Sequence, residues 1–302
     1  MTAVELPNHV PEAFEIFVDQ QVEKYTQSGV VVPWETVGDI KKHPKPQMVM
    51  PLGVEESKPR AFLDARWLNL MGRKCPFQMD AVGKVAQCAW PGAFQMTADH
   101  KSGFHHVPLD AGSRQYFGFA WRGRYYVFTV LCFGWCSSPY IYHSLSAVVS
   151  RYLRTKGIPV LTWIDDFYFT NFRASRGLAP KIQAEAATVT AYVVMHTFYE
   201  AGYFVSIDKC ELDATTRLIF LGVVCDSVEE KFIIPDDKLD KLETILVEAL
   251  KQEVISFHML EKLAGKCTSM SVACPAAALY THHMYQAIGK YQRQGGQKRN
   301  RD

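Results

Sequence analysis

Hydrophobic residues recur at helical spacing near the amino end of the chain, and the same spacing returns in three later segments. Between residues 11 and 28, before a stop signal at Gly29, one face of the predicted helix carries Phe14, Phe17, Val18, Val22 and Tyr25. Comparable patterns at 140–157, 181–202 and 236–272 predict three more helical regions. The last pattern is amphipathic throughout, so it predicts a separate helical bundle at the carboxyl end.

Between the helical segments, short runs of apolar and β-branched residues predict strands. They fall at 30–34, 47–54, 59–65, 94–100, 116–131, 158–171 and 218–235. The run 116–131 is predicted as a hairpin about Arg122–Gly123, and 218–235 as a strand pair. Residues 65–71 are predicted as a connecting turn. The order of elements predicts a mixed α+β body with a helical cap.

Composition narrows the class of protein. The 302-residue chain is 48% hydrophobic and 21% charged, which is typical of a folded protein and argues against a disordered or fibrous one. No apolar stretch approaches the roughly 20 residues that span a bilayer, and the amino end lacks a signal pattern. We therefore expect an intracellular protein, cytoplasmic or nuclear, that is neither secreted nor bound to a membrane.

The net charge does not show whether the protein binds nucleic acid. A formal net charge of +2 neither requires nor excludes nucleic acid, because clustering of basic residues matters more than their total. Basic residues do cluster, at 39–47, 55–60, 64–74 and 290–302. Such clusters are usually solvated surface, so they do not by themselves indicate a nucleic-acid partner.

Two adjacent aspartates, Asp165 and Asp166, interrupt the apolar and aromatic run 161–170, and Asp99 lies near the end of the predicted strand 94–100. Strand ends can hold catalytic groups rigidly while leaving them open to solvent. Three carboxylates brought together repel one another unless a cation lies among them, and a divalent metal is the usual cation. Alternatively, Asp165 and Asp166 are ordinary turn residues, and the pair alone does not decide between these hypotheses.

Five blocks in a fixed order favour the metal site. TWIDDFYF (162–169) resembles the aspartate hairpin of reverse transcriptases, and MTADHKSGFHHVPLD (96–110) resembles the strand with their first carboxylate. FGWCSSP (133–139) is similar to their glycine turn, KPRAFLDARWLN (58–69) to their basic fingers strand, and FLGVVCD (220–226) to their primer-grip hairpin. The closest resemblance is to tyrosine-recombinase (DIRS-type) retrotransposons and related LTR or pararetroviral polymerases.

The chain departs from the family pattern at three positions. Trp163 stands where tyrosine is common, Phe133 where many retroviral enzymes carry glutamine, and Cys136 is an unusual neighbour of the glycine turn. These departures affect the expected fidelity rather than the expected chemistry.

The resemblance implies an α+β fold of the right-hand polymerase type, with fingers, a palm that carries an antiparallel sheet, and a helical thumb. The expected boundaries are fingers at 1–92 and 113–132, palm at 93–112 and 133–227, thumb at 228–290, and a basic tail or linker at 291–302.

The resemblance also implies the chemistry, namely template-directed DNA synthesis by attack of a primer 3′-hydroxyl on a deoxynucleoside triphosphate. Asp99 and Asp165 are expected to bridge two Mg²⁺ ions, with Mn²⁺ as a substitute, and Asp166 to help hold the ion that activates the hydroxyl. The main-chain carbonyl of His100 is expected to complete the nucleotide-side ion. Lys209 matches the lysine that supports the leaving pyrophosphate.

A second group of residues is expected at the incoming nucleotide. Lys58 and Arg60 match the fingers residues that bind the triphosphate, although a solvated strand edge is the alternative. Phe104 lies where the family places an aromatic ring under the sugar, which predicts a preference for deoxynucleotides, and an ordinary core phenylalanine is the alternative. The other expected members of this site are Gly103, Phe133 and Gly134.

Further residues are expected along the template and primer: Arg66, Trp163, Leu221 and Gly222. Arg66 is also expected to join Asp64 and Asn69 in hydrogen bonds that stabilise the fingers. Gly134 is expected to let the backbone approach a template base or the nucleotide, since it has no side chain.

Two other functions remain open on the sequence. An RNA-dependent RNA polymerase shares the paired aspartates, but it needs a second acid shortly after the first carboxylate, where this chain has Phe104. A catalytically silent scaffold that binds nucleic acid commonly lacks one metal-binding acid, whereas all three are present. The expected partners are a primer–template of RNA or DNA, deoxynucleoside triphosphates, and further polyprotein domains such as a ribonuclease H, recombinase or integrase.

Overall fold

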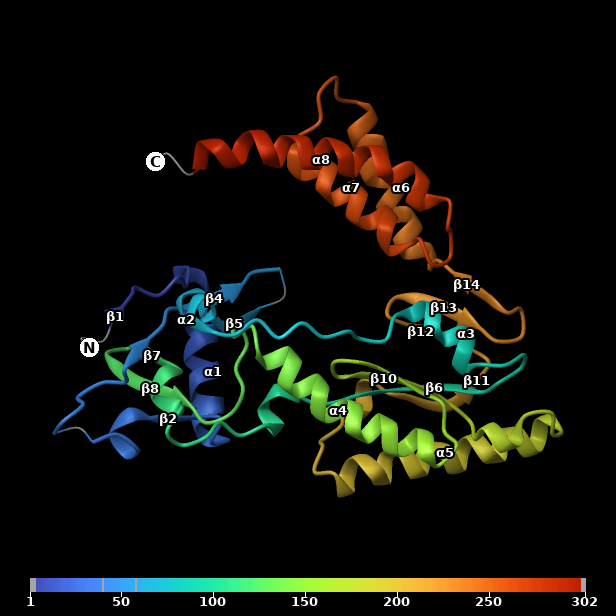
Figure 1. The fold of residues 1–302 in the computed structure, drawn as a ribbon, viewed down its shortest axis with the longest axis horizontal. Helices are drawn as coiled ribbons and strands as arrows, with labels where there is room; N and C mark the ends of the chain where they lie inside the picture. The colour runs from blue at the N-terminus through green and yellow to red at the C-terminus, as the bar shows by residue number, and fades with distance from the viewer. Residues whose placement is uncertain (1–3, 40, 58, 300–302) are drawn as a thin grey trace.

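The structure, a computed structural model, describes residues 4–39, 41–57 and 59–299, with side chains as far as Arg293. Figure 1 shows three parts, which we call the amino-terminal body, the central body and the helical bundle. The helical bundle stands above the other two and is joined to them through a single connection after β14 (Lys231–Ile233). None of the helices in these residues is long and apolar enough to cross a membrane.

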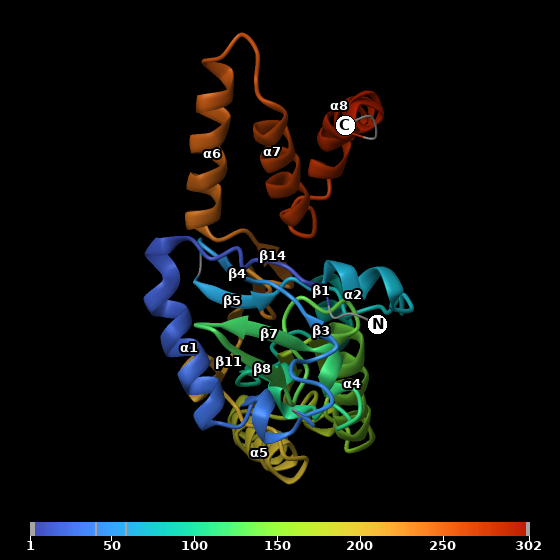
Figure 2. The same cartoon turned by 90° about the vertical axis from the view of Figure 1, so that its left-hand side faces the viewer.

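The amino-terminal body contains a five-stranded sheet. Its strands are, in sheet order, β1 (Val4–Glu5), β3 (Met48–Val49), β7 (Gly118–Trp121), β8 (Arg124–Phe128) and β2 (Val31–Pro33). Helix α1 (Glu15–Gln27) lies along this body in Figure 2 and buries Val18 and Val22 in its core. The β7–β8 hairpin turns at Arg122–Gly123, which confirms the predicted turn.

One prediction in this body is wrong. Residues 65–71 were expected to be a connecting turn, but they form helix α2 (Arg66–Met71). The segment contains no glycine or proline, and its amides close helical hydrogen bonds, such as Asn69 N–H to the Ala65 carbonyl at 2.7 Å.

A second, two-stranded sheet pairs β4 (Leu52–Glu55) with β5 (Arg60–Leu63). Pro51 separates β4 from β3.

The central body is built on a four-stranded sheet. Its strands are, in sheet order, β11 (Glu211–Thr215), β6 (Gln95–Asp99), β10 (Asp166–Thr170) and β9 (Val160–Trp163). Helices α4 (Ser138–Thr155) and α5 (Pro180–Glu200) cover one face of this sheet (Figure 1). Phe167 and Phe169 point into this layer and are fully buried, whereas Tyr168 points to the opposite face and packs on Phe220.

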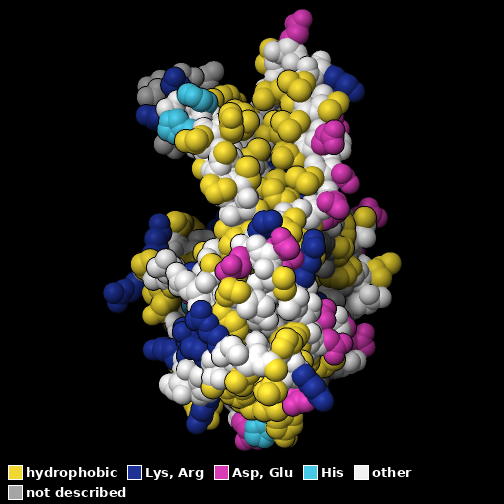
Figure 3. Space-filling view, turned by 90° about the vertical axis from the view of Figure 1, so that its right-hand side faces the viewer, with side chains coloured by type: hydrophobic (Ala, Val, Ile, Leu, Met, Phe, Trp, Pro, Cys, Tyr) yellow, Lys and Arg dark blue, Asp and Glu magenta, His cyan; other side chains and the backbone are white. Residues whose placement is uncertain are grey.

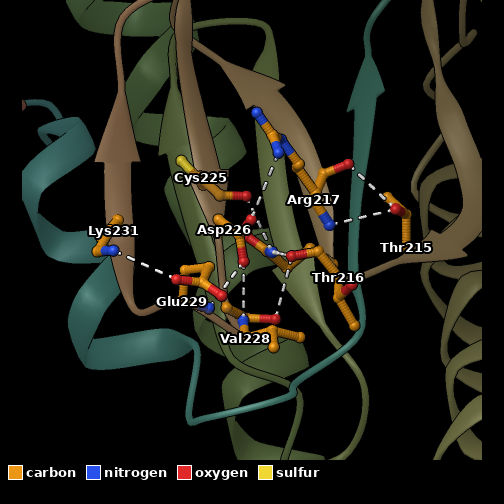
Figure 4. A network of polar contacts seen from close by, with 10 residues as sticks. Thr215, Thr216, Arg217, Cys225, Asp226, Val228, Glu229 and Lys231 are labelled. Atoms are coloured by element: carbon orange, nitrogen blue, oxygen red, sulfur yellow. Dashed lines mark hydrogen bonds and ion pairs between the residues drawn. The ribbon is translucent and has the colours of Figure 1, made fainter.

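The run 218–235 forms three strands rather than the predicted pair: β12 (Arg217–Phe220), β13 (Val223–Asp226) and β14. The third strand was missed because it is only three residues long and follows a charged turn. Figure 4 shows how Asp226 holds that turn. Its carboxylate accepts the backbone N–H groups of Val228 and Glu229 at 3.0 and 2.9 Å and lies 3.9 Å from Arg217.

A buried glutamine joins this small sheet to the central body. The Gln95 side-chain amide donates to the carbonyls of Thr216 and Cys225 at 2.7 and 3.2 Å. Its oxygen accepts the Tyr168 hydroxyl at 2.8 Å. Because every polar atom of this side chain has a partner, the hairpin of β12 and β13 has a defined position against the aspartate-bearing strands.

The carboxyl-terminal part is the predicted helical bundle of α6 (Asp236–Leu250), α7 (Phe257–Ser269) and α8 (Ala277–Arg299). Helix α8 continues through most of the segment that was expected to be a basic tail or linker. Hydrophobic side chains cover much of the bundle face seen in Figure 3. Helices α6 and α7 bury only Ile245, Leu263 and Ala264, so the bundle has a thinner core than the central body.

The remaining elements are short. They are helix α3 (Val85–Cys88) and the 3₁₀ turns Glu12–Phe14, Trp34–Thr36, Val82–Lys84, Gly103–His106, Arg114–Tyr116, Arg173–Ser175 and Ile207–Lys209.

Candidate active site

The adjacent aspartates lie at a tight turn between two central strands. Trp163 at the end of β9 is paired with Asp166 at the start of β10, so Ile164 and Asp165 form the turn itself. Ile164 has a φ of 55°, which is unfavourable for a β-branched residue. Backbone strain of this kind persists only where the surrounding structure imposes it, and it is typical of functional sites.

Strand pairing brings the third aspartate to the same place. Asp99 at the end of β6 is the direct partner of Asp166 in the antiparallel β6–β10 pair. The next amide, of His100, donates to the Asp165 carbonyl at 2.9 Å. The structure therefore brings together all three of the carboxylates that the sequence singled out.

The chemistry of these carboxylates reflects their crowding. Burial raises the pKa of Asp166 to about 6, and the negative charges of Asp165 and Asp99 add to the effect. Burial also raises the pKa of Asp165, with a further contribution from Asp99. Lys209, from the turn before β11, lies 3.4 Å from the Asp99 carboxylate and partly compensates the negative charge. The site therefore holds more negative charge than one lysine balances.

The donor set suits Mg²⁺. Within the described residues, no three acidic, histidine or cysteine side chains already converge as a ready-made metal cage. Mg²⁺ does not require such a cage, because it usually takes one or two carboxylates and fills its remaining positions with water and substrate phosphates. The raised pKa values of Asp165 and Asp166 reflect burial and nearby negative charge, which a bound divalent cation would offset.

The ring of His100 anchors the strand end that carries Asp99. His100 is 1% exposed, and its Nδ1 lies 2.6 Å from the Tyr142 hydroxyl of α4. The imidazole stacks on Tyr203 with centroids 4.3 Å apart, and Phe167 and Phe198 flank it, each at 4.5 Å. Burial lowers the pKa of His100 to about 3, so the ring is neutral and acts as part of the core.

A cleft of about 990 Å³ opens beside the aspartates. Asp99, Asp165 and Lys209 line its central side, and Arg60 of β5 lines the side of the amino-terminal body. The lining also includes other predicted site residues, namely His100, Gly103, Phe104 and Phe133. The cleft therefore places Asp99, Asp165, Arg60 and Lys209, with the rings of Phe104 and Phe133, around one volume large enough for a nucleotide.

Comparison with known proteins identifies the family. The family model described as "Reverse transcriptase (RNA-dependent DNA polymerase)" matches residues 75–225. This chain belongs to that family. The reverse transcriptase segment includes all three aspartates and Lys209.

Foamy viral proteins are among the relatives. The chain is 27% identical over 209 residues to the Pro-Pol polyprotein of simian foamy virus type 1, which covers 66% of the chain and 17% of the polyprotein. A foamy viral protease-reverse transcriptase solved with double-stranded DNA has a TM-score of 0.71 at 18% identity, over 95% of this chain and 45% of that one. The native prototype foamy virus protein has a TM-score of 0.59 at 16% identity, over 95% of this chain and 38% of that one.

These structural matches confirm the predicted α+β right-hand fold of fingers, palm and thumb. The amino-terminal body corresponds to the fingers, the central body to the palm and the helical bundle to the thumb. The expected resemblance to the polymerases of DIRS-type elements is not tested by these relatives and stays a prediction.

The glycine turn of this chain lies against the fingers. Gly134 has a φ of 103°, and a Cβ on it would lie 1.8 Å from the Leu63 carbonyl oxygen. The close backbone approach that was expected toward a base or nucleotide is thus made, in this structure, to strand β5. Asn69 bridges the same turn, donating to the Gly134 carbonyl and accepting from the Cys136 N–H, each at 2.9 Å.

Other predicted residues lie at the edges of the site. Arg66 is 82% exposed and pairs with Asp64 at 2.6 Å, as expected for fingers stabilisation. Leu221 and Gly222 form the two-residue turn between β12 and β13, with φ values of 48° and 75°. Neither these two, nor Arg66, Trp163, Gly134 or Asp166, line the cleft. Lys58 lies outside the described residues.

Sequence reasoning missed the contribution of helix α1 to the site. Phe17, Gln21, Lys24 and Tyr25 line the cleft from this helix, and the Tyr25 ring meets His105 edge-on with centroids 5.2 Å apart. Phe17 and Tyr25 were read only as the buried face of a helix. No local signal separates a helix face that packs on a sheet from one that also borders a cleft.

Proposed function

We propose that this chain is an RNA-directed DNA polymerase domain, which extends a primer with deoxynucleoside triphosphates on an RNA or DNA template. The observation that carries the proposal is that Asp99, Asp165 and Asp166 all lie at one end of the palm sheet, next to a cleft lined by Arg60 and Lys209. Membership of the reverse transcriptase family supports the same reaction.

In this proposal, Asp99, Asp165 and Asp166 hold two Mg²⁺ ions, or Mn²⁺ in their place, with the main-chain carbonyl of His100 as a further ligand. The bound metal would supply positive charge that stabilises the attacking and leaving oxygens. The rigid strand pairing of Asp99 with Asp166 limits the movement of these ligands. Such preorganisation matters because a metal site that is loose by about 1 Å loses much of its catalytic effect.

The nucleotide would lie in the cleft between palm and fingers. Arg60 would bind the triphosphate, together with Lys58, and Lys209 would balance the charge of the leaving pyrophosphate. Phe104, half-buried on the cleft wall beside Gly103, would lie under the sugar and exclude a ribose 2′-hydroxyl. Phe133 and Gly134 would complete the nucleotide side.

The template and primer would follow the fingers, palm and thumb. We assign Arg66 and Trp163 to the template side, and Leu221 and Gly222 to the primer. A Cβ on Gly222 would meet the end of the Lys238 side chain, so this side chain reaches from α6, the first helix of the thumb, to the turn. That contact would let the thumb position the primer terminus.

The chain spans 17% of the foamy viral polyprotein that it matches. We therefore propose further polyprotein domains only as partners of this chain and assign none of their activities to it. We propose the predicted boundaries for this domain: fingers 1–92 and 113–132, palm 93–112 and 133–227, thumb 228–290, and a basic segment 291–302. Two foamy viral protease-reverse transcriptase structures contain double-stranded DNA and an RNA/DNA hybrid, and we propose comparable primer–templates as partners here.

Primer extension tests the proposal. The chain is incubated with a primed RNA template, Mg²⁺, and either deoxynucleotides or ribonucleotides, beside an Asp165→Asn, Asp166→Asn control. Mg²⁺-dependent deoxynucleotide addition that is lost in the control is the expected result. Ribonucleotide addition alone would favour an RNA polymerase. Tight binding of primer–template without extension by either set would favour a catalytically silent scaffold.

A further inference from the structure

The exposed Arg60 side chain is supported by an aromatic ring. Its guanidinium carbon lies 4.8 Å from the centre of the Phe133 ring, which is a cation–π contact. Arg60 begins strand β5, and Phe133 begins the glycine turn, 73 residues away in sequence. The basic side chain at the fingers side of the cleft is thus held from the palm side of the chain.

The backbone fixes the ring relative to the strand that carries Arg60. The Phe133 carbonyl accepts the Leu63 N–H at 3.0 Å, at the far end of the same strand β5. Gly134 then brings the turn directly against the Leu63 carbonyl, where a side chain would not fit. The backbone of Phe133 therefore cannot shift along β5 without breaking this junction.

The same ring also contacts the residue proposed to lie under the sugar. Phe133 and Phe104 have ring centroids 4.9 Å apart at an interplanar angle of 47°, and both rings are partly exposed to the cleft. Phe104 is held in turn by an edge-on contact with Tyr142, at 5.8 Å. Arg60, Phe133 and Phe104 therefore form a continuous row along the cleft wall.

We infer that Phe133 is a positioning residue that holds the Arg60 guanidinium toward the nucleotide's phosphates and ties its place to that of Phe104. The inference rests on the proposed function, because it assigns the cleft to a nucleoside triphosphate. A long arginine side chain without such support samples many rotamers, so each binding event must order it again. An aromatic face offers the guanidinium a defined place, and an aliphatic side chain of similar size does not.

A double-mutant cycle tests this role. The variants are Phe133→Leu, Arg60→Ala and the pair together, with Phe133→Tyr as the conservative variant that keeps the ring. We expect Phe133→Leu to raise KM for a deoxynucleoside triphosphate about 3- to 10-fold, with kcat changed less than about 2-fold. Phe133→Tyr keeps the ring and should therefore raise KM less than Phe133→Leu does. In the Arg60→Ala background, Phe133→Leu should change KM less than about 2-fold, because the cation is absent.

Binding of inorganic tripolyphosphate, measured by calorimetry, provides a second readout that needs no extension. Tripolyphosphate has no sugar or base, so its affinity reports the phosphate contact alone. We expect Phe133→Leu to weaken it by a factor similar to the rise in KM, and only when Arg60 is present. Tyr199→Leu, an aromatic loss at a 76% exposed position on α5, is the matched control and should change neither value.

The outcomes separate the two claims. If the chain extends primers but Phe133→Leu has the same effect with and without Arg60, the positioning role is overturned while the polymerase assignment stands. The same conclusion follows if Phe133→Tyr is as defective as Phe133→Leu. If the chain extends nothing yet tripolyphosphate binding follows the cycle, the row of Arg60 and Phe133 is a phosphate site and the polymerase assignment fails.

Discussion

The two sides of the cleft hold their charged groups in different ways. On the palm side, Asp99 and Asp166 lie on paired strands, with Asp165 in the adjoining turn, and the next residues of β10 include the completely buried Phe167 and Phe169. On the fingers side, Arg60 extends from a two-stranded sheet and is exposed, supported by one aromatic ring. The acids are thus held by the fold as a whole, whereas the arginine is held by local contacts.

The difference fits the work that each side would do. Metal ligands must keep their geometry through every cycle, and burial on a closed strand ladder supplies that rigidity. A side chain that binds and releases a nucleotide must move, so it belongs at a less stable and more open part of the structure. Changes on the palm side should therefore affect the chemical step, and changes on the fingers side should affect nucleotide binding.

The largest expected effect is on the palm side. Asp99→Asn keeps the shape of the side chain but removes a charge from the metal site, so extension should fall about 1000-fold, equivalent to about 4 kcal/mol of barrier. Single-nucleotide extension under saturating substrate measures it, with circular dichroism to confirm the fold. Activity within tenfold of the unaltered chain would mean that Asp99 is not a metal ligand.

The second-largest effect is expected where the glycine turn meets strand β5. Gly134→Ala forces a Cβ toward the Leu63 carbonyl at a φ of 103°, so we expect it to reduce the free energy of unfolding by about 3 kcal/mol. Gly123→Ala is the matched control, because its φ is also positive at 74° but the space around it is open. That control should cost only about 1 kcal/mol. Urea unfolding measures both, and equal losses would show that the contact with β5 is unimportant.

A smaller effect is expected at the residue between the two sides. Phe104→Ala should increase ribonucleotide incorporation relative to deoxynucleotide incorporation about 10-fold, or about 1.4 kcal/mol in discrimination. The cause is loss of the ring that would clash with a 2′-hydroxyl. Competing kcat/KM values for the two nucleotide types measure the ratio, and Phe104→Tyr, which keeps the ring, should retain it. An unchanged ratio in Phe104→Ala would make Phe104 a core residue only.

The smallest expected effect is the change that Asp166 causes in the free energy of unfolding. The pKa of Asp166 is raised to about 6 in the folded chain, above the roughly 3.9 of an unfolded aspartate, so the folded state holds this proton more tightly. Stability from this group is therefore complete below about pH 4 and is lost as pH rises through 6. Without divalent metal, Asp166→Asn should raise the free energy of unfolding by about 1 kcal/mol at pH 7.5, allowing for solvent screening.

Denaturant unfolding at pH 4 and pH 7.5 measures that change. The advantage of Asp166→Asn should disappear at pH 4, where both side chains are uncharged. Adding Mg²⁺ at pH 7.5 should stabilise the unaltered chain more than the variant. A difference that does not depend on pH would mean that ionisation of Asp166 is not its cause.

Most helices and strands were predicted from local sequence patterns. Helix α1, the hairpin at Arg122–Gly123 and the strands on either side of Asp165 follow from periodicity and turn chemistry, and each is present. The errors occurred where the signal was short or mixed. Helix α2 has only six residues, and strand β14 has three, so neither contains enough periods to be distinguished from a connection.

The residues of the site were also predicted only in part. Asp99, Asp165, Phe104 and Arg60 were singled out from motifs in the sequence, and the structure places all four around one cleft. The part played by helix α1 was not predictable, because its Lys24 and Tyr25 reach the cleft only through the packing of the fingers. Neither residue belongs to a motif, and lining a cleft leaves no mark on a single sequence.

The sequence by itself singled out the residues proposed to carry the chemistry and predicted most of the local structures that present them, because turns, strand ends and family motifs depend on neighbouring residues. Only the tertiary structure decided that Asp99 pairs with Asp166, and that the Phe133 ring lies under Arg60. Those contacts join residues 67 and 73 positions apart in the chain. They depend on strand register and on the packing of whole elements, which no local pattern specifies.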